Sequence, residues 1–118
     1  AAGLAMLQQL NEDADVYTRL KEKTDYLHKG LKSVLETKDL EFTINQVGSM
    51  ISVHFAKDTV SNFTTAAAGD NATFKKFFHG MLANGIYIAP SAYESWFLCD
   101  ALSYEDLDAT IAACDTVM

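Results

Sequence analysis

Long apolar runs and paired cysteines are almost absent from this sequence. No apolar stretch approaches the roughly 18 residues that a membrane-spanning helix needs, so no such helix is expected. The N-terminus lacks the basic segment of a secretory signal. Cys99 and Cys114 form no CxxC motif, and we interpret them as small buried thiols of a protein in a reducing compartment rather than as a disulfide framework.

Motifs that would make a complete catalytic site are missing as well. The histidines, His28, His54 and His79, have no metal-binding spacing. The chain has no glycine-rich phosphate loop, no GxSxG motif and no nucleophile flanked by a base. We therefore expect this chain to contribute to a site rather than to contain a whole one.

Positive charge is scarce, because nine lysines and arginines stand against 16 acidic residues and the formal net charge is -7. An acidic surface repels phosphate backbones and anionic lipid headgroups, so neither nucleic acid nor a membrane is expected as a partner. The 118 residues are enough for one domain, 1–118, with its own core. The missing initial methionine and a helical pattern from the first residue favour an excised fragment or a processed product.

Apolar residues spaced three and four apart predict four helices. In the longest one, Gly30 indicates a close contact, because glycine costs about 1 kcal/mol relative to alanine inside a helix. Capping residues mark the starts of three helices: Asp13 or Asp15, Asp70 or Asn71, and the pair Ser103 and Asp106. Asn84-Gly85 marks the end of the helix that begins near Asp70. The predicted helices cover residues 1–10, 14–36, 71–84 and 103–117.

Alternating apolar and polar residues predict strands at Glu41–Val47 and Met50–Phe55, with Gly48-Ser49 between them as a tight turn or a bulge. Shorter strands are predicted at Ile86–Ala89 and Trp96–Cys99, and Ala56–Gly69 is expected to be a long loop. Paired strands with covering helices predict an α+β fold, a small antiparallel or mixed sheet with helices on one side.

One stretch, residues 85–97, places a lone carboxylate among aromatic residues. Glu94 lies between Tyr93 and the pair Trp96-Phe97, shortly after the only proline, Pro90. A charged group costs free energy when it is dehydrated, so it rarely lies among aromatics without a partner or a function. One interpretation has Glu94 pointing to water while the aromatics pack inward. The other makes Glu94 a functional carboxylate.

The same region carries a family resemblance. Gln46-Val47-Gly48-Ser49-Met50 and the run from Phe74 to Glu94, with its Phe-Phe-His-Gly-Met and Pro-Ser-Ala-Tyr-Glu motifs, closely resemble the C-terminal part of the glutamate-1-semialdehyde 2,1-aminomutase family. This family is similar to class III aminotransferases of the type I pyridoxal-phosphate fold. It converts glutamate 1-semialdehyde to 5-aminolevulinate, the tetrapyrrole precursor, by way of pyridoxamine phosphate and a diamine intermediate.

The resemblance implies that this chain is the small C-terminal domain of such an enzyme. Its partners would be the large domain of the same polypeptide, a second copy in a homodimer and a small-molecule substrate. The compartment would be the bacterial cytoplasm or the plastid stroma. The large domain would hold pyridoxal 5'-phosphate or pyridoxamine 5'-phosphate, and the isolated fragment would be inactive.

One catalytic residue is carried over from the resemblance. Glu94 matches the family's glutamate that faces the cleft, where it would orient or electrostatically tune the reacting amines. Ser91 and Tyr93 are expected to shape the substrate-binding wall. No lysine stands in a matching motif, so none is assigned to the cofactor: Lys21, Lys23, Lys29, Lys32, Lys38, Lys57, Lys75 and Lys76.

Two alternatives remain open at this stage. The chain could be the small domain of a class III aminotransferase with another substrate, for which an arginine near Glu94 would be expected. Arg19 is the only arginine. It could also be a stand-alone α+β module that binds a ligand or mediates dimerisation, which the absence of a catalytic lysine fits equally well.

Overall fold

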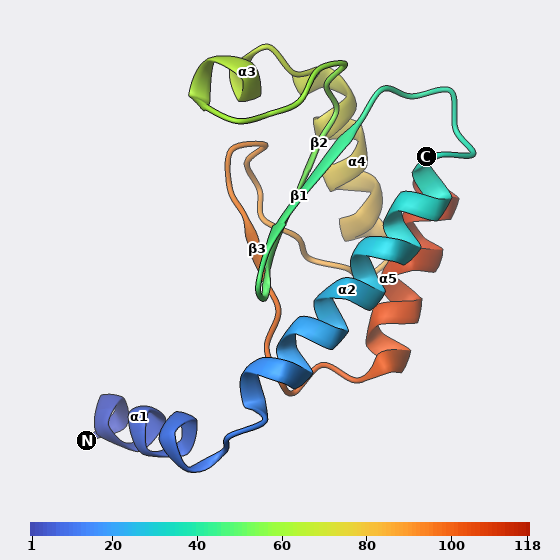
Figure 1. Ribbon diagram of the computed structural model, residues 1–118. Coiled ribbons are helices and arrows are strands. Elements are labelled where there is room, and N and C mark those ends of the chain that lie inside the picture. The colour runs from blue at the N-terminus through green and yellow to red at the C-terminus, as the bar shows by residue number, and fades with distance from the viewer.

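The computed structural model describes residues 1–118 and contains five helices and three strands. The strands form one antiparallel sheet in the order β1-β2-β3, and the three long helices lie on one side of it (Figure 1). This arrangement confirms the predicted α+β fold. In chain order the elements are α1 (Ala2–Glu12), α2 (Val16–Leu35), β1 (Thr43–Val47), β2 (Met50–His54), α3 (Phe63–Ala67), α4 (Asn71–Ala83), β3 (Trp96–Phe97) and α5 (Tyr104–Val117).

A two-residue turn joins β1 to β2 and sets their register. Val47 pairs with Met50 across the turn, and Gly48 adopts a φ of 57°, which favours glycine. The turn, rather than the bulge, is therefore the correct alternative. Because side chains alternate along a strand, Ile51 and Val53 face the helices and are buried.

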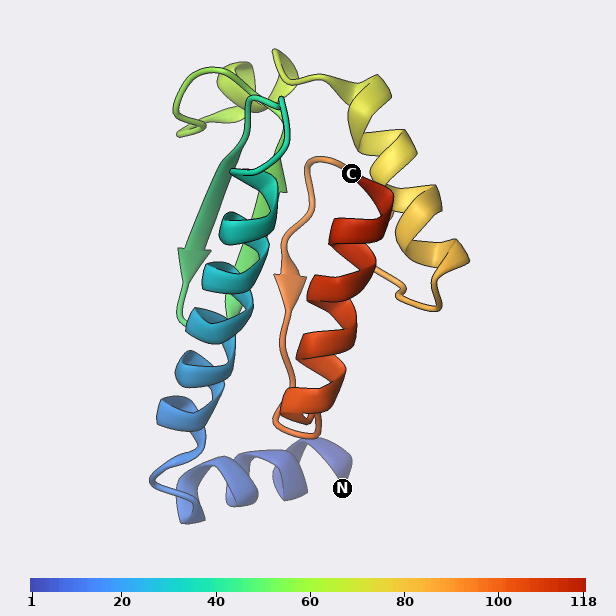
Figure 2. The ribbon, with the colours of Figure 1, turned by 90° about the vertical axis from the view of Figure 1, so that its right-hand side faces the viewer.

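The helical layer packs through α5, which lies beside α2 and also contacts α4 (Figure 2). Gly30 of α2 faces Ile111, and Gly80 of α4 faces Val117, with no room for a side chain at either glycine. The predicted close contact at Gly30 is therefore confirmed. Fully buried side chains at the centre of the core come from the helices and β2: Leu31, Leu35, Ile51, Phe77, Met81, Leu107 and Cys114.

Gly30→Ala is expected to destabilise the fold by about 1 kcal/mol. A Cβ at this position would collide with Cδ1 of Ile111 and lie 2.7 Å from its Cγ1. Overpacking of this kind costs about 1–3 kcal/mol, and the higher helix propensity of alanine offsets about 1 kcal/mol of it. Urea denaturation of the two proteins measures the difference.

Ile111→Val provides the matched background for this measurement, because valine lacks the colliding Cδ1. The cost of Gly30→Ala is expected to shrink in that background. An equal cost with isoleucine and with valine at position 111 would show that the contact is not what excludes a side chain from position 30.

The predicted helix ends are confirmed at several places. The Asp70 carboxylate accepts the backbone N–H groups of Ala72 and Thr73, and Ser103 forms a capping box with Asp106. At the other end of α4, Gly85 has a φ of 81° and terminates the helix. No helix in the structure is both long and apolar enough to cross a membrane.

Four predictions about residues 41–99 were wrong. The loop Ala56–Gly69 contains α3, which begins because Asn62 and Thr65 form a capping box. Ile86–Ala89 is not a strand, because no strand pairs with it. The strand at Trp96–Cys99 shrinks to Trp96–Phe97, because its partner β2 begins at Met50. The first strand also starts two residues later than predicted, at Thr43.

Candidate functional site

Glu94 lies on a tight turn between the end of α4 and the start of β3. The Glu94 N–H donates to the carbonyl oxygen of Ser91 over 3.1 Å, and the Tyr93 N–H donates to Ser91 Oγ over 3.2 Å. We call residues 91–94 the Glu94 turn. Ser91 thus shapes the turn through both its main chain and its side chain, and the Glu94 side chain is exposed.

Buried residues on either side anchor the Glu94 turn. Ile88 before it is 5% exposed and Leu98 after it is 7% exposed. Between the turn and Leu98, the Trp96 ring stacks on fully buried Phe77, with ring centroids 6.2 Å apart. The turn therefore projects from a fixed base while its own carboxylate remains in solvent.

The aromatics around Glu94 do not all pack inward, contrary to the first interpretation of this stretch. Tyr93 is 53% exposed and Phe97 is 71% exposed, and only Trp96 reaches the core. Glu94 is exposed, as that interpretation expected, but the rings of Tyr93 and Phe97 near it are exposed as well. Such rings mark a surface that contacts something else.

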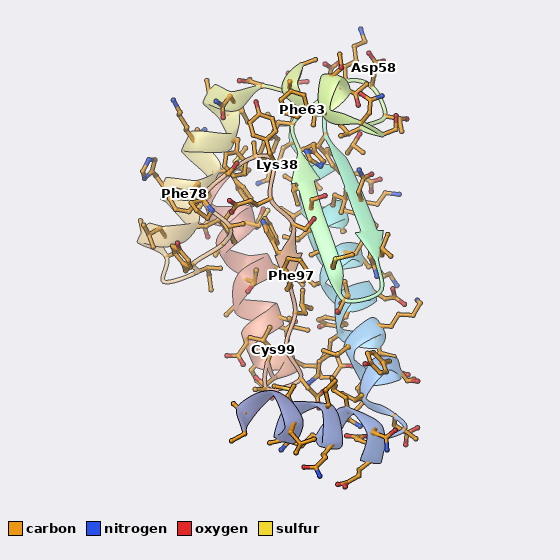
Figure 3. All side chains as sticks on the ribbon, turned by 90° about the vertical axis from the view of Figure 1, so that its left-hand side faces the viewer. Lys38, Asp58, Phe63, Phe78, Phe97 and Cys99 are labelled. Atoms are coloured by element: carbon orange, nitrogen blue, oxygen red, sulfur yellow. The ribbon has the colours of Figure 1, made fainter.

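Phe97 belongs to a wider apolar surface on the open face of the sheet. Val47 pairs with Met50 and Met50 pairs with Phe97, so the three side chains are cross-strand neighbours on the face away from the helices. Figure 3 labels Phe97 on this face. All three are exposed. We call Val47, Met50 and Phe97 the open-face patch.

Arg19 is not available to recognise a substrate carboxylate. Its Nη2 lies 2.7 Å from Asp13 Oδ2 and 2.6 Å from Asp100 Oδ2. Its Nη1 also donates to Asp13 and its Nε to Asp100, so two N–H edges of the guanidinium are paired. The guanidinium lowers the pKa of both carboxyl groups. Lys23 also donates to the main-chain oxygen of Asp100, over 2.5 Å. This cluster joins the end of α1 to α2 and to the loop after β3.

The two cysteines differ in environment. Cys114 is buried, and desolvation raises the pKa of its thiol to about 11, so it stays protonated at neutral pH. Cys99 is exposed, so the interpretation of two buried thiols was wrong for it. Both thiols are free, and no group of His, Cys, Asp and Glu side chains is arranged to hold a metal ion.

Comparison with known proteins shows what this chain resembles. No family model matches the sequence. The glutamate-1-semialdehyde 2,1-aminomutase of Flavobacterium johnsoniae is 62% identical over 117 residues, which are 99% of this chain and 27% of that enzyme. The chain is homologous to one segment of glutamate-1-semialdehyde 2,1-aminomutases. The resemblance seen in the sequence is thereby confirmed.

Two further aminomutases match in the same way. That of Flavobacterium psychrophilum is 63% identical over 117 residues, again 99% of this chain and 27% of the enzyme. That of Thermus thermophilus is 45% identical over 113 residues, 96% of this chain and 27% of the enzyme. The chain therefore spans about a quarter of the length of the aminomutases that it matches.

Solved transaminases share the fold of this chain. An omega-transaminase from Sphaerobacter thermophilus matches with a TM-score of 0.80 and 18% identity, over 98% of this chain and 26% of that one. A transaminase with PLP bound matches with a TM-score of 0.75 and 20% identity, over 98% and 25% respectively. Here too the match covers about a quarter of the longer chain.

No residue of this chain stands out as the lysine that would hold pyridoxal phosphate. None of the eight lysines is buried, and none lies in the Glu94 turn. Lys23 and Lys38, the two that are half-buried, pair with Asp100 and Asp115. That the cofactor-binding groups lie outside these 118 residues stays a prediction of the resemblance. Glu94, Ser91 and Tyr93 stay predictions as site residues.

Proposed function

We propose that this chain is the small C-terminal domain of a glutamate-1-semialdehyde 2,1-aminomutase, which converts glutamate 1-semialdehyde to 5-aminolevulinate. The observation that carries the proposal is the 62% identity to the Flavobacterium johnsoniae enzyme over 99% of the chain. Pyridoxal phosphate supplies the chemistry that moves the amino group, and the rest of the polypeptide would hold it. The enzyme would act as a homodimer in a bacterial cytoplasm or a plastid stroma.

Within that enzyme, this domain would place the carboxylate of Glu94 at the edge of the active site. Glu94 is exposed on a turn whose base is anchored in the core, so it extends beyond this domain without distorting it. A carboxylate held beside amines that gain and lose protons stabilises their charged forms. Ser91 fixes the turn, and Tyr93 contributes an exposed ring to the wall beside it.

The chain covers 27% of the matching aminomutase, so the remaining polypeptide would be about three times as long as this domain. The domain has exposed apolar surfaces that fit contact with such a partner. The open-face patch is exposed on the sheet, and α1 has no buried residue, with Leu4 64% and Leu7 66% exposed. Exposed apolar side chains gathered on one face mark a contact surface. We assign both surfaces to contacts with the remainder of the same polypeptide.

A chimera tests the proposal. This chain replaces the matching segment of the Flavobacterium johnsoniae aminomutase, and formation of 5-aminolevulinate from glutamate 1-semialdehyde is measured. We expect the chimera to retain at least a tenth of the parent's kcat, because the two segments are 62% identical, and we expect the isolated 118-residue chain to form no product.

Two outcomes would contradict the proposal. A folded, cofactor-loaded chimera that transfers amino groups to an external keto acid but forms no 5-aminolevulinate would favour another class III aminotransferase. Saturable binding of a small molecule by the isolated chain, together with an inactive chimera, would favour a stand-alone binding module.

A further inference from the structure

We propose that Phe63 is a positioning residue that holds the Glu94 turn through the contact of its ring with Tyr93. The inference rests on the proposed function only in assigning Glu94 to the reaction. Phe63 is the first residue of α3 and is 75% exposed, so the core does not account for it. Its ring centroid lies 5.7 Å from that of Tyr93, with the ring planes tilted by 40°.

The helix that carries Phe63 is anchored more firmly than its five residues suggest. The Asn62 side chain accepts the Thr65 N–H, and Thr65 Oγ1 accepts the N–H groups of Ser61 and Asn62, over 3.0–3.1 Å. Just before α3, the carbonyl oxygen of Val60 accepts the Asn45 side-chain N–H of β1 over 2.8 Å. Val60 itself is 7% exposed. Phe63 therefore stands on a segment tied to the sheet.

The other end of α3 is tied down as well. The Asp70 N–H, just past the helix, donates to the carbonyl oxygen of Phe55 over 2.8 Å, directly after β2. A Cβ atom at Gly69 would lie 3.3 Å from the carbonyl oxygen of Phe55 and 3.2 Å from that of Ala66. The segment thus rejoins the sheet closely on both sides of α3, and Phe63 has a fixed base.

Within the Glu94 turn itself, Ala92 is the side chain that packs against the core. The two hydrogen bonds of the turn link Ser91 only to Tyr93 and Glu94. Ala92 and Tyr93 border a small pocket beside Phe74 at the start of α4. The aromatic contact with Phe63 links the exposed ring of Tyr93 to α3. Since Glu94 follows Tyr93 directly, holding this ring restrains the backbone from which the Glu94 carboxylate extends.

A double-mutant cycle in the chimera tests the inference. Phe63→Ala is expected to lower kcat for glutamate 1-semialdehyde about threefold to tenfold, as the loss of one aromatic pair would. Phe63→Tyr, which keeps the ring, is expected to restore the rate. Thr64→Ala, a neighbouring exposed position on α3, serves as the control and is expected to leave the rate unchanged. In a Glu94→Gln background, Phe63→Ala is expected to have no further effect, because it acts through Glu94.

A second readout does not depend on the reaction. Phe63→Ala is expected to speed amide hydrogen exchange at Tyr93, Glu94 and Ser95 in the chimera by severalfold, and Thr64→Ala is not. Faster exchange supports the positioning role even if Glu94→Gln leaves the rate unchanged, in which case only the assignment of Glu94 to the reaction fails. Unchanged exchange with a weakened domain contact would make Phe63 a plain interface residue and overturn the inference. If Phe63→Ala lowers kcat by the same factor in the Glu94→Gln background as in the unchanged chimera, the inference is also overturned.

Discussion

Glu94→Gln in the chimera is expected to lower kcat by about 100-fold, the lower end of what a positioned acid or base contributes. Glutamine keeps the size of the side chain and removes its charge. Because the Glu94 side chain is exposed and stands apart from the ion pairs of the chain, the change leaves the fold intact. The measurement is initial-rate kinetics of 5-aminolevulinate formation, with the absorption spectrum of the bound cofactor recorded alongside.

Glu22→Gln is the matched control, since it makes the same charge change at an exposed position of α2. We expect the control to keep full activity. Equal rates for Glu94→Gln and for the unchanged chimera, with identical spectra, would remove Glu94 from the reaction and leave it as a solvated turn residue.

Phe77→Ala is expected to cost about 3–5 kcal/mol of unfolding free energy, the largest stability effect of any substitution discussed. Phe77 is fully buried, and its ring contacts two others: Phe55, with a centroid distance of 5.4 Å, and Trp96, at 6.2 Å. Alanine would leave a cavity beneath β2 and β3. A loss of this size is a large fraction of the total stability of a small domain.

Trp96, the only tryptophan, reports the unfolding of this region directly by fluorescence during urea denaturation. Lys76→Ala, one residue away on the exposed side of α4, is the control and is expected to change stability by less than about 0.5 kcal/mol. A loss below about 1.5 kcal/mol for Phe77→Ala would mean that the neighbouring rings collapse into the space, and that the core is less rigid than the structure implies.

The elements that the sequence predicted well are those determined by local pattern. The alternation in β1 and β2 and the caps at Asp70 and Ser103 involve residues within a few positions of each other, and all are confirmed. α3 was missed because its signal is a capping box of Asn and Thr in place of the more usual Ser or Thr with Glu. Ile86–Ala89 has the composition of a strand, but a strand also needs a neighbour, which local composition does not reveal.

In the candidate site, too, contiguous residues could be recognised from the sequence and contacts between distant residues could not. The Glu94 motif could be recognised because its residues are contiguous, from Pro90 to Glu94. The contact between Phe63 and Tyr93 joins positions 30 residues apart, and the pairing of Arg19 with Asp100 joins positions 81 apart. Neither pair has a periodic spacing, so only the three-dimensional structure brings its members together.

The cluster of Asp13, Arg19 and Asp100 has a mechanical consequence for α1. Since α1 has no buried residue in the isolated chain, its direction there depends on ion pairs at its base rather than on packing along its length. A helix of 11 residues is about 16 Å long, so it acts as a lever. A tilt of about 10° at the base moves its far end by about 3 Å. Salt screens charges exposed to this extent, and the angle of this lever therefore responds to ionic strength.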